Sequence, residues 1–186
     1  MALYKDTYRI ESARLQTYDY AQAGDYFVTL CTHRHKCVFG EVRGEEMHIN
    51  EIGKILQRCW EEIPRHFPNV ELDAFVVMPN HIHGIIVIKD HGRDVQLNVS
   101  TASTANVIPD TNAESSEKTH ASISPRKGSL SVIIRTFKAA VTTLCRTNGY
   151  QDFRWQSRFY DHIIRDEKDL DNVINHVPTV QMAIHE

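Results

Sequence analysis

The sequence predicts an α+β protein, a single-domain sandwich in which helices pack on a sheet. Three observations support this class. Runs rich in aromatic and β-branched residues, which are typical of strands, occur at residues 26–32, 70–77 and 82–88. Apolar residues recur at helical spacing after Asn50 and again after Ser129. The 186 residues are enough for one domain with a sizeable core and do not favour a second full domain.

The first half of the chain predicts a strand, a helix and two more strands. The strand at residues 26–32 precedes a turn-like stretch through residues 39–44. Asn50 is the expected N-cap of the first helix, which Pro64 and Pro68 close. The second and third strands are joined by a short turn at Pro79-Asn80. The apolar face of the helix comprises Ile52, Ile55, Leu56, Cys59, Trp60 and Ile63.

The second half of the chain begins with a change of composition. Residues 90–127 are dominated by Ser, Thr, Asn, Asp and Ala, which predicts a flexible insertion within a single domain spanning residues 1–186. A second helix follows Ser129, a short strand lies within residues 155–165, and a third helix ends at Pro178. The resulting order of elements predicts a ferredoxin-like βαββαβ sandwich with an added C-terminal helix.

Composition and charge exclude several classes of protein. The formal net charge is −3, which argues against a basic protein that coats duplex DNA. No run of about 18 apolar residues occurs, and the first residues lack the apolar core of a signal peptide. We therefore expect a cytoplasmic protein with no membrane partner. The four cysteines are scattered, which indicates reduced thiols rather than a disulfide framework.

His81 and His83 are the most informative residues of the chain, because they flank a single apolar residue, Ile82, within a predicted strand. On an extended backbone both imidazoles point to the same face, and two neutral ring nitrogens can hold a divalent metal ion. The alternative is that two polar residues sit on the exposed face of an edge strand.

Four segments together resemble one family. The chain resembles the IS200-like transposases of the Y1, HUH type, and most closely the REP-associated tyrosine transposase group, from about residue 26 to residue 175 with the insertion excepted. The segments that carry the resemblance are residues 27–32, residues 75–84, residues 129–131 with Phe137-Lys138, and residues 155–165.

The resemblance implies cleavage and joining of single-stranded or hairpin DNA. A divalent ion, Mg²⁺ or Mn²⁺, held by His81 and His83 would polarise the scissile phosphate. A tyrosine oxygen would attack it, giving a 5′-phosphotyrosine link and a free 3′-hydroxyl, so that strand joining needs no ATP. Relatives occur as monomers and as homodimers that share active sites, so both states are open.

The C-terminal residues depart from the family pattern. His176 stands at the position of the family tyrosine, and the third metal ligand is expected near Val180, where Gln181 is the nearest polar candidate. Three accounts remain open. His176 acts as nucleophile through a phosphohistidine, another tyrosine such as Tyr160 or Tyr150 reaches the site, or the chain is a DNA-binding descendant that does not cleave. A metal-dependent phosphodiesterase that uses water is a further alternative.

Other polar residues suggest DNA contacts. Aromatic rings can stack on DNA bases, and arginines beside them can neutralise phosphates. The alternatives are that the aromatic rings pack against a helix and that the charged residues lie on a solvated helix face. His162 could lie near the metal or stabilise the sheet. The stretch 31–37 holds four potential zinc ligands, but their close spacing favours a basic turn at the end of a strand. The candidate DNA-binding residues are Arg135, Lys138, Trp155, Arg158 and Arg165.

Overall fold

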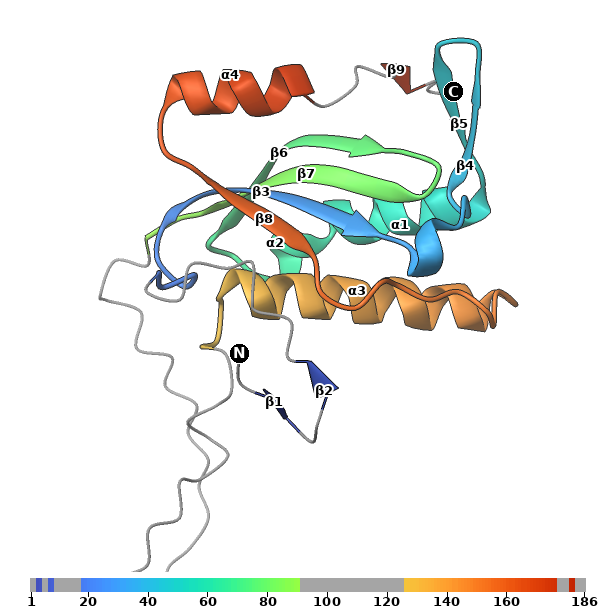
Figure 1. Ribbon diagram of the computed structural model, residues 1–186, viewed down its shortest axis with the longest axis horizontal. Coiled ribbons are helices and arrows are strands. Elements are labelled where there is room, and N and C mark those ends of the chain that lie inside the picture. The colour runs from blue at the N-terminus through green and yellow to red at the C-terminus, as the bar shows by residue number, and fades with distance from the viewer. Residues whose placement is uncertain (1–2, 5–6, 9–17, 91–125, 177–180, 183–186) are drawn as a thin grey trace, which may run out of the picture.

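The centre of the protein is a four-stranded antiparallel sheet (Figure 1). Its strands lie in the order β6 (Val70–Val77), β7 (His81–Ile88), β3 (Gly24–Cys31) and β8 (Tyr160–Ile164). The computed structural model describes residues 3–4, 7–8, 18–90, 126–176 and 181–182, and the side chains of residues 3–4, 7–8, 175–176 and 181–182 fall outside this description. Nearly all of the predicted insertion at 90–127 therefore lies outside the described residues.

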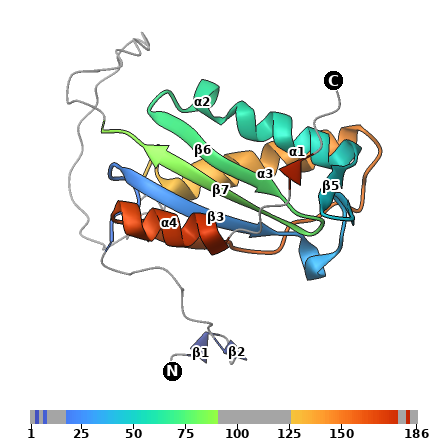
Figure 2. The ribbon, with the colours of Figure 1, turned by 90° about the horizontal axis from the view of Figure 1, so that it is seen from above.

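The helices lie on both sides of the sheet. The helices α1 (Glu51–Glu61), α2 (Ile63–His66) and α3 (Leu130–Thr147) cover one side, and α4 (Glu167–His176) lies on the other, over β3 when the molecule is seen from above (Figures 1 and 2). The protein is thus a mixed α+β structure, and its main elements follow the predicted order of strand, helix, two strands, helix, strand and helix. None of the helices that the structure describes is long and apolar enough to span a membrane.

The core lies between the sheet and the helices α1 and α3. Tyr26, Val28 and Leu30, alternate residues of β3, have no exposed surface, and Trp60 of α1 is 2% exposed. Alternation along a strand sends the intervening residues to the opposite face, which is the face toward α4. Burial of this apolar surface is the main source of the fold's stability.

The ends of α1 follow from local sequence. Asn50 caps the helix as predicted, because its side-chain oxygen accepts a hydrogen bond of 3.0 Å from the Gly53 N–H. The helix ends at Glu61, and Pro64 lies in the first turn of α2 rather than ending the helical region. Proline is tolerated there because the first N–H groups of a helix have no intrahelical partner.

The stretch predicted to be turn-like is a β-hairpin. It consists of β4 (Gly40–Arg43) and β5 (Glu46–Ile49), and β9 (Gln181–Met182) pairs with β5 in parallel. Two further short strands, β1 (Leu3–Tyr4) and β2 (Thr7–Tyr8), pair with each other. After β3 a single 3₁₀ turn, His33–His35, leads toward the hairpin.

Candidate metal and nucleic-acid site

His81 and His83 lie on β7, on the sheet face opposite α1 and α3. Their Nε2 atoms are 3.1 Å apart, and the ring planes are inclined at 80° with centroids 4.7 Å apart. Two nitrogens that each bind one metal ion at about 2.1 Å are separated by about 3 Å when they subtend a right angle at the ion. The spacing of the two rings therefore fits a shared cation.

The other ring nitrogens are held by neighbouring side chains. His81 Nδ1 donates to Asn80 Oδ1 at 2.6 Å, and His83 Nδ1 is hydrogen-bonded to Thr29 Oγ1 at 2.9 Å. A proton on Nδ1 leaves the lone pair on Nε2, which is the tautomer that binds metal. Two lone pairs 3.1 Å apart repel each other unless a proton or a metal ion lies between them.

Burial keeps both imidazoles neutral. It lowers the pKa of His83 to about 4, with a smaller contribution from the neighbouring His81. Burial also lowers the pKa of His81, and the charge of His35 adds to this. At neutral pH both rings are therefore available as neutral ligands.

Asn80 and Thr29 were not singled out from the sequence as site residues. Asn80 holds two segments together, because its carbonyl accepts from the Thr32 N–H at 2.9 Å and from Thr32 Oγ1 at 3.0 Å, and its Nδ2 donates to His35 O at 3.2 Å. Its position next to His81 is a signal that could have identified it. Thr29 is opposite His83 in the sheet, and only the strand register shows that.

Among the described residues, His81 and His83 are the two candidate metal ligands whose ring nitrogens converge. Within the part of the chain that the structure describes, no three His, Cys, Asp or Glu side chains lie close enough to hold one ion, the zinc candidates of residues 31–37 included. The position near Val180, where a third ligand was expected, lies outside the described residues. Gln181 is opposite Glu46 on β5.

Tyr160 and His162 lie on the same sheet face as the histidine pair. Tyr160 is directly opposite Thr29, which is directly opposite His83, so the three residues form one row across β8, β3 and β7. The Tyr160 side chain is 55% exposed. The His162 Nε2 atom is hydrogen-bonded to the Asp169 carboxylate of α4 at 2.9 and 3.0 Å. This contact joins α4 to the sheet.

The other two nucleophile candidates lie at the ends of helices. His176 is the last residue of α4, and its side chain lies outside the described residues. Tyr150 follows α3, in the loop that leads to β8, and is 36% exposed. Of the three candidates, Tyr160 is the one whose place in the register is shared with the histidine pair.

Two of the predicted DNA-binding residues have packing roles. The Lys138 ammonium donates to the carbonyls of Gln156 at 2.7 Å and Arg158 at 3.0 Å, and burial lowers its pKa. The Trp155 indole donates to Lys138 O at 3.2 Å, and its ring contacts three phenylalanine rings, those of Phe39, Phe137 and Phe153. Both side chains fix the loop before β8.

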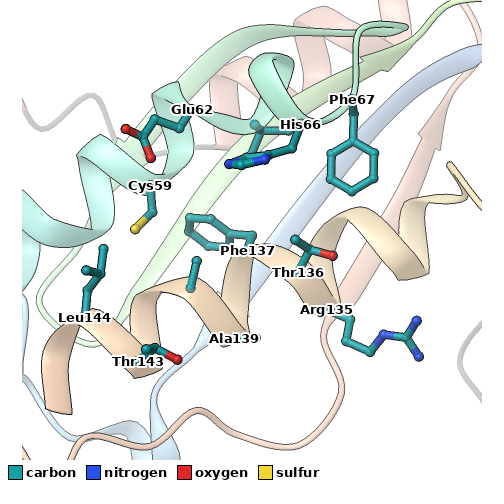
Figure 3. A pocket seen from close by; sticks show the side chains of 12 residues that line it. Cys59, Glu62, His66, Phe67, Arg135, Thr136, Phe137, Ala139, Thr143 and Leu144 are labelled. Carbon is teal, nitrogen blue, oxygen red and sulfur yellow. The ribbon is translucent and has the colours of Figure 1, made fainter. Parts of the chain in front are cut away.

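The three arginines are spread over the molecule. Arg135 borders a cavity of about 630 Å³ between α1, α2 and α3 (Figure 3), which the sheet separates from the histidine pair. Arg158 is exposed in the loop before β8 with a φ of 69°, and Arg165 is exposed just after β8. The structure therefore does not gather the five predicted DNA-binding residues on one surface, and their DNA contacts remain a prediction.

Comparison with known proteins places the chain among relatives. No protein-family model matches the sequence. An uncharacterized protein of Haemophilus influenzae is 35% identical over 166 residues, which are 89% of this chain and 84% of that protein. A solved structure of a REP-associated tyrosine transposase bound to a REP hairpin matches with a TM-score of 0.53 and 19% identity, over 90% of this chain and 70% of that chain. The chain therefore belongs to one family with the Haemophilus influenzae protein and has the fold of a REP-associated tyrosine transposase.

Proposed function

We propose that this protein is a metal-dependent transposase that acts on single-stranded or hairpin DNA at the sheet face carrying His81 and His83. The observation that carries the proposal is the convergence of two neutral Nε2 atoms at 3.1 Å, each ring held in place through its Nδ1. The fold of a REP-associated tyrosine transposase supports it.

The topology supports a more specific statement of the fold. We infer a ferredoxin-like βαββαβ unit, because the antiparallel order β6-β7-β3-β8 places the first and third strands of the unit at its centre. The helix α4 is the added C-terminal helix, and it lies on the open side of that unit (Figure 1).

In the proposed reaction the chain's residues hold the metal and supply the attacking group. Asn80 and Thr29 fix the ring orientation of His81 and His83, and the two Nε2 atoms bind the ion. A bound Mg²⁺ or Mn²⁺ would supply Lewis-acid polarisation of the scissile phosphate. The attacking oxygen displaces the 3′-oxygen of the neighbouring nucleotide, which leaves as a hydroxyl, and a 5′-phosphate ester forms on the protein.

We propose Tyr160 as the attacking residue. It is separated from His83 by two strand spacings, about 10 Å, a span that a phenol side chain and a phosphate group can fill together. His176 is the second candidate. The helix α4 starts just after β8, is about 15 Å long and lies on the sheet side opposite α1 and α3, which is the side of the histidine pair (Figure 1).

A non-cleaving DNA-binding protein is the alternative function. The observation that favours it is that a histidine, His176, stands where the resembled family has its tyrosine. Such a protein would keep the metal site and would bind hairpin DNA, but it would form no covalent link to the DNA.

A covalent-adduct assay separates the two functions. Labelled single-stranded hairpin DNA is incubated with the protein and Mn²⁺ and then run on a denaturing gel. The transposase is expected to give a protein–DNA adduct that His81→Ala and Tyr160→Phe abolish and His176→Ala retains. An adduct lost in His176→Ala alone would assign the nucleophile to His176. Hairpin binding without any adduct would overturn the cleavage activity and support the alternative.

Replacing Thr29 by valine should weaken metal binding with little change in the fold. Valine keeps the shape but cannot bond His83 Nδ1, so the ring is free to rotate and to change tautomer. Loss of such a supporting hydrogen bond costs about tenfold or more in metal affinity. Calorimetric titration with Mn²⁺ measures the metal affinity. Thr143→Val, at an exposed position of α3, is the matched control. Equal affinities of the two variants would contradict this prediction.

The histidine pair should keep its metal in mildly acidic solution. Protons and metal compete for Nε2, and burial lowers the pKa of both rings, that of His83 to about 4, so we expect Mn²⁺ affinity to persist to a lower pH than at a pair of ordinary histidines. An ordinary histidine would begin to lose the ion below about pH 6.5. A metal-affinity series against pH tests this, and a midpoint of loss above pH 6 would contradict it.

The same pKa makes the metal-free protein less stable in acid. The unfolded chain binds the His83 proton near pH 6.5, whereas the folded chain binds it only near pH 4. The free energy of unfolding should therefore decrease as the pH falls through this interval. Thermal unfolding in chelator should show a smaller acid loss for His83→Gln than for the wild type, and identical losses would contradict the expectation.

A further inference from the structure

His162 of β8 and Asp169 of α4 form a hydrogen-bonded pair on the sheet face that carries the histidine pair. The His162 Nε2 atom lies 2.9 and 3.0 Å from the two oxygens of the Asp169 carboxylate. The contact does not cover either side chain, because that of His162 is 39% exposed and that of Asp169 is 27% exposed. The imidazole is therefore accessible to groups that lie on this face.

The Asp169 carboxylate fixes the proton of His162 on Nε2. The hydrogen bond from His162 lowers the pKa of Asp169, and the Arg165 N–H donates to the same carboxylate at 3.2 Å. An ionised carboxylate only accepts hydrogen bonds, so the His162 Nε2 donates. In the neutral imidazole, Nδ1 then carries the lone pair, and it has no hydrogen bond to any residue that the structure describes. The pair thus holds a proton acceptor that no protein group occupies within the described ranges.

This acceptor is next to Tyr160 and close to the metal candidates. His162 follows Tyr160 by two residues on β8, so both side chains project from the same face, with Cα atoms about 7 Å apart. Phe27 of β3 lies directly opposite His162. The Phe27 ring in turn stacks on His83, with centroids 5.3 Å apart and an interplanar angle of 15°. One aromatic ring therefore separates His162 from the histidine pair.

A tyrosine that attacks a phosphate has to lose its hydroxyl proton. A phenol in water ionises near pH 10, so only about one in a thousand is the reactive phenolate at neutral pH. Imidazoles ionise near pH 6.5, which makes them efficient proton acceptors at neutral pH. Tyr160 is 55% exposed and has no hydrogen bond to another described residue, so its ring is free to turn toward His162.

We propose, on the basis of the proposed function, that His162 is the general base that accepts the hydroxyl proton of Tyr160, with Asp169 as its positioning residue. As the phenol O–H bond breaks, the proton passes to His162 Nδ1 and the phenol oxygen forms a bond to phosphorus. The bond from phosphorus to the 3′-oxygen breaks, and this oxygen takes a proton from water. In strand joining, the attacking 3′-hydroxyl gives its proton to water, and His162 returns its proton to the leaving phenol oxygen. Between the two steps Asp169 stabilises the imidazolium.

The rate of adduct formation as a function of pH tests the proposal. Excess protein is mixed with labelled hairpin DNA and Mn²⁺ between about pH 6 and about pH 8.5, and the adduct is followed on denaturing gels. His162→Gln keeps an amide N–H for Asp169 but cannot accept a proton. It should lower the rate at pH 7 by about a hundredfold to ten-thousandfold. This deficit should shrink as the pH rises, because hydroxide replaces the missing base, whereas the wild-type rate should level off.

Other groups near His162 stay the same in this comparison. His162→Gln leaves each of them in place, so a difference between the two pH profiles reports on the imidazole itself. The titratable and charged groups on the elements around His162 are Asp169 of α4, Arg165 and Asp166 between β8 and α4, Asp25 of β3, and His83 behind Phe27.

Chemical rescue separates proton transfer from the anchoring of α4 to the sheet. Free imidazole added to His162→Ala should restore adduct formation, because it supplies the missing proton acceptor and cannot replace an anchor. His162→Gln should keep the wild-type affinities for Mn²⁺ and hairpin DNA and the wild-type melting temperature. His66→Gln, at an exposed position of α2 on the opposite side of the sheet, is the matched control and should form the adduct like the wild type.

The outcomes distinguish this base from the proposed function. A wild-type adduct that is lost in Tyr160→Phe but forms at the wild-type rate in His162→Gln would overturn the base alone. An equal loss at every pH in His162→Gln, with no rescue of His162→Ala by imidazole, would also overturn it and leave an anchor. A wild-type adduct that persists in Tyr160→Phe would overturn the base together with the assignment of Tyr160. Absence of any wild-type adduct would overturn both the base and the cleavage activity.

Discussion

Replacing His81 or His83 by alanine is expected to abolish the covalent adduct and to lower Mn²⁺ affinity by about a hundredfold or more. The described residues offer the ion these two side chains, with Nε2 atoms 3.1 Å apart, and each variant leaves one. Changes to residues that only support a ligand cost up to about a hundredfold, so loss of a ligand itself should cost at least as much.

The measurement is calorimetric titration with Mn²⁺, followed by the adduct assay on the same preparations. His66→Ala is the matched control, because His66 is exposed on α2, on the opposite side of the sheet. Circular dichroism verifies that the variants fold, since Asn80 and Thr29 each lose a partner. Wild-type affinity in both alanine variants, together with an adduct, would refute the assignment of these histidines as metal ligands.

Elements with strong local signals could be predicted from the sequence. The strand Val70–Val77 has the predicted bounds, and the helix that follows Asn50 begins where its cap was predicted. Both depend on signals that lie within a few residues, namely β-branched runs and a side chain that can accept from the first turn of a helix. The alternation that puts His81 and His83 on one face is likewise a property of a single strand.

The hairpin of β4 and β5 was missed because its sequence carries little hydrophobic signal. Its eight strand residues include one fully buried side chain, Met47, and several charged residues. Pairing of backbone groups, not burial, holds most of this hairpin together. An interpretation based on apolar periodicity therefore predicts only turns in this segment.

The partners of the site residues could not be predicted, because they depend on contacts between distant segments. Thr29 supports His83 only through the register of β3 with β7. Lys138 and Trp155 looked like DNA contacts in the sequence, and the fold joins them to each other and to the loop before β8. A cation beside an aromatic ring has the same sequence pattern in both situations.

Replacing Gly84 by alanine is expected to be the most destabilising single-methyl change in the sheet. A Cβ at this position would overlap the six-membered ring of Trp60, which is 2% exposed. That ring cannot move aside easily, since it stacks on Phe75 with centroids 4.7 Å apart and meets Phe137 edge-on at 5.4 Å. Overpacking of this kind costs about 3 kcal/mol, which corresponds to roughly 10 °C in Tm for a domain of this size.

Thermal unfolding of Gly84→Ala beside Gly44→Ala separates overpacking from backbone effects. Gly44 has a φ of +64° and no atom within 4 Å of an added Cβ, so its alanine variant bears only the backbone cost of about 1 kcal/mol. Equal losses in the two variants would show that Trp60 yields to the methyl group.

A second substitution, at Trp60, tests whether this ring causes the loss of stability in Gly84→Ala. Trp60→Phe removes the atoms that the new methyl group would overlap, and it removes no hydrogen bond, because Trp60 Nε1 has no partner among the described residues. The double variant should therefore recover stability relative to Gly84→Ala. His83 is the residue immediately before Gly84 on β7 and points to the other face, so a strand displaced at Gly84 also moves the His83 Nε2. Mn²⁺ affinity should fall in Gly84→Ala and return in the double variant, which would link packing on the core side of the sheet to the metal site on its open side.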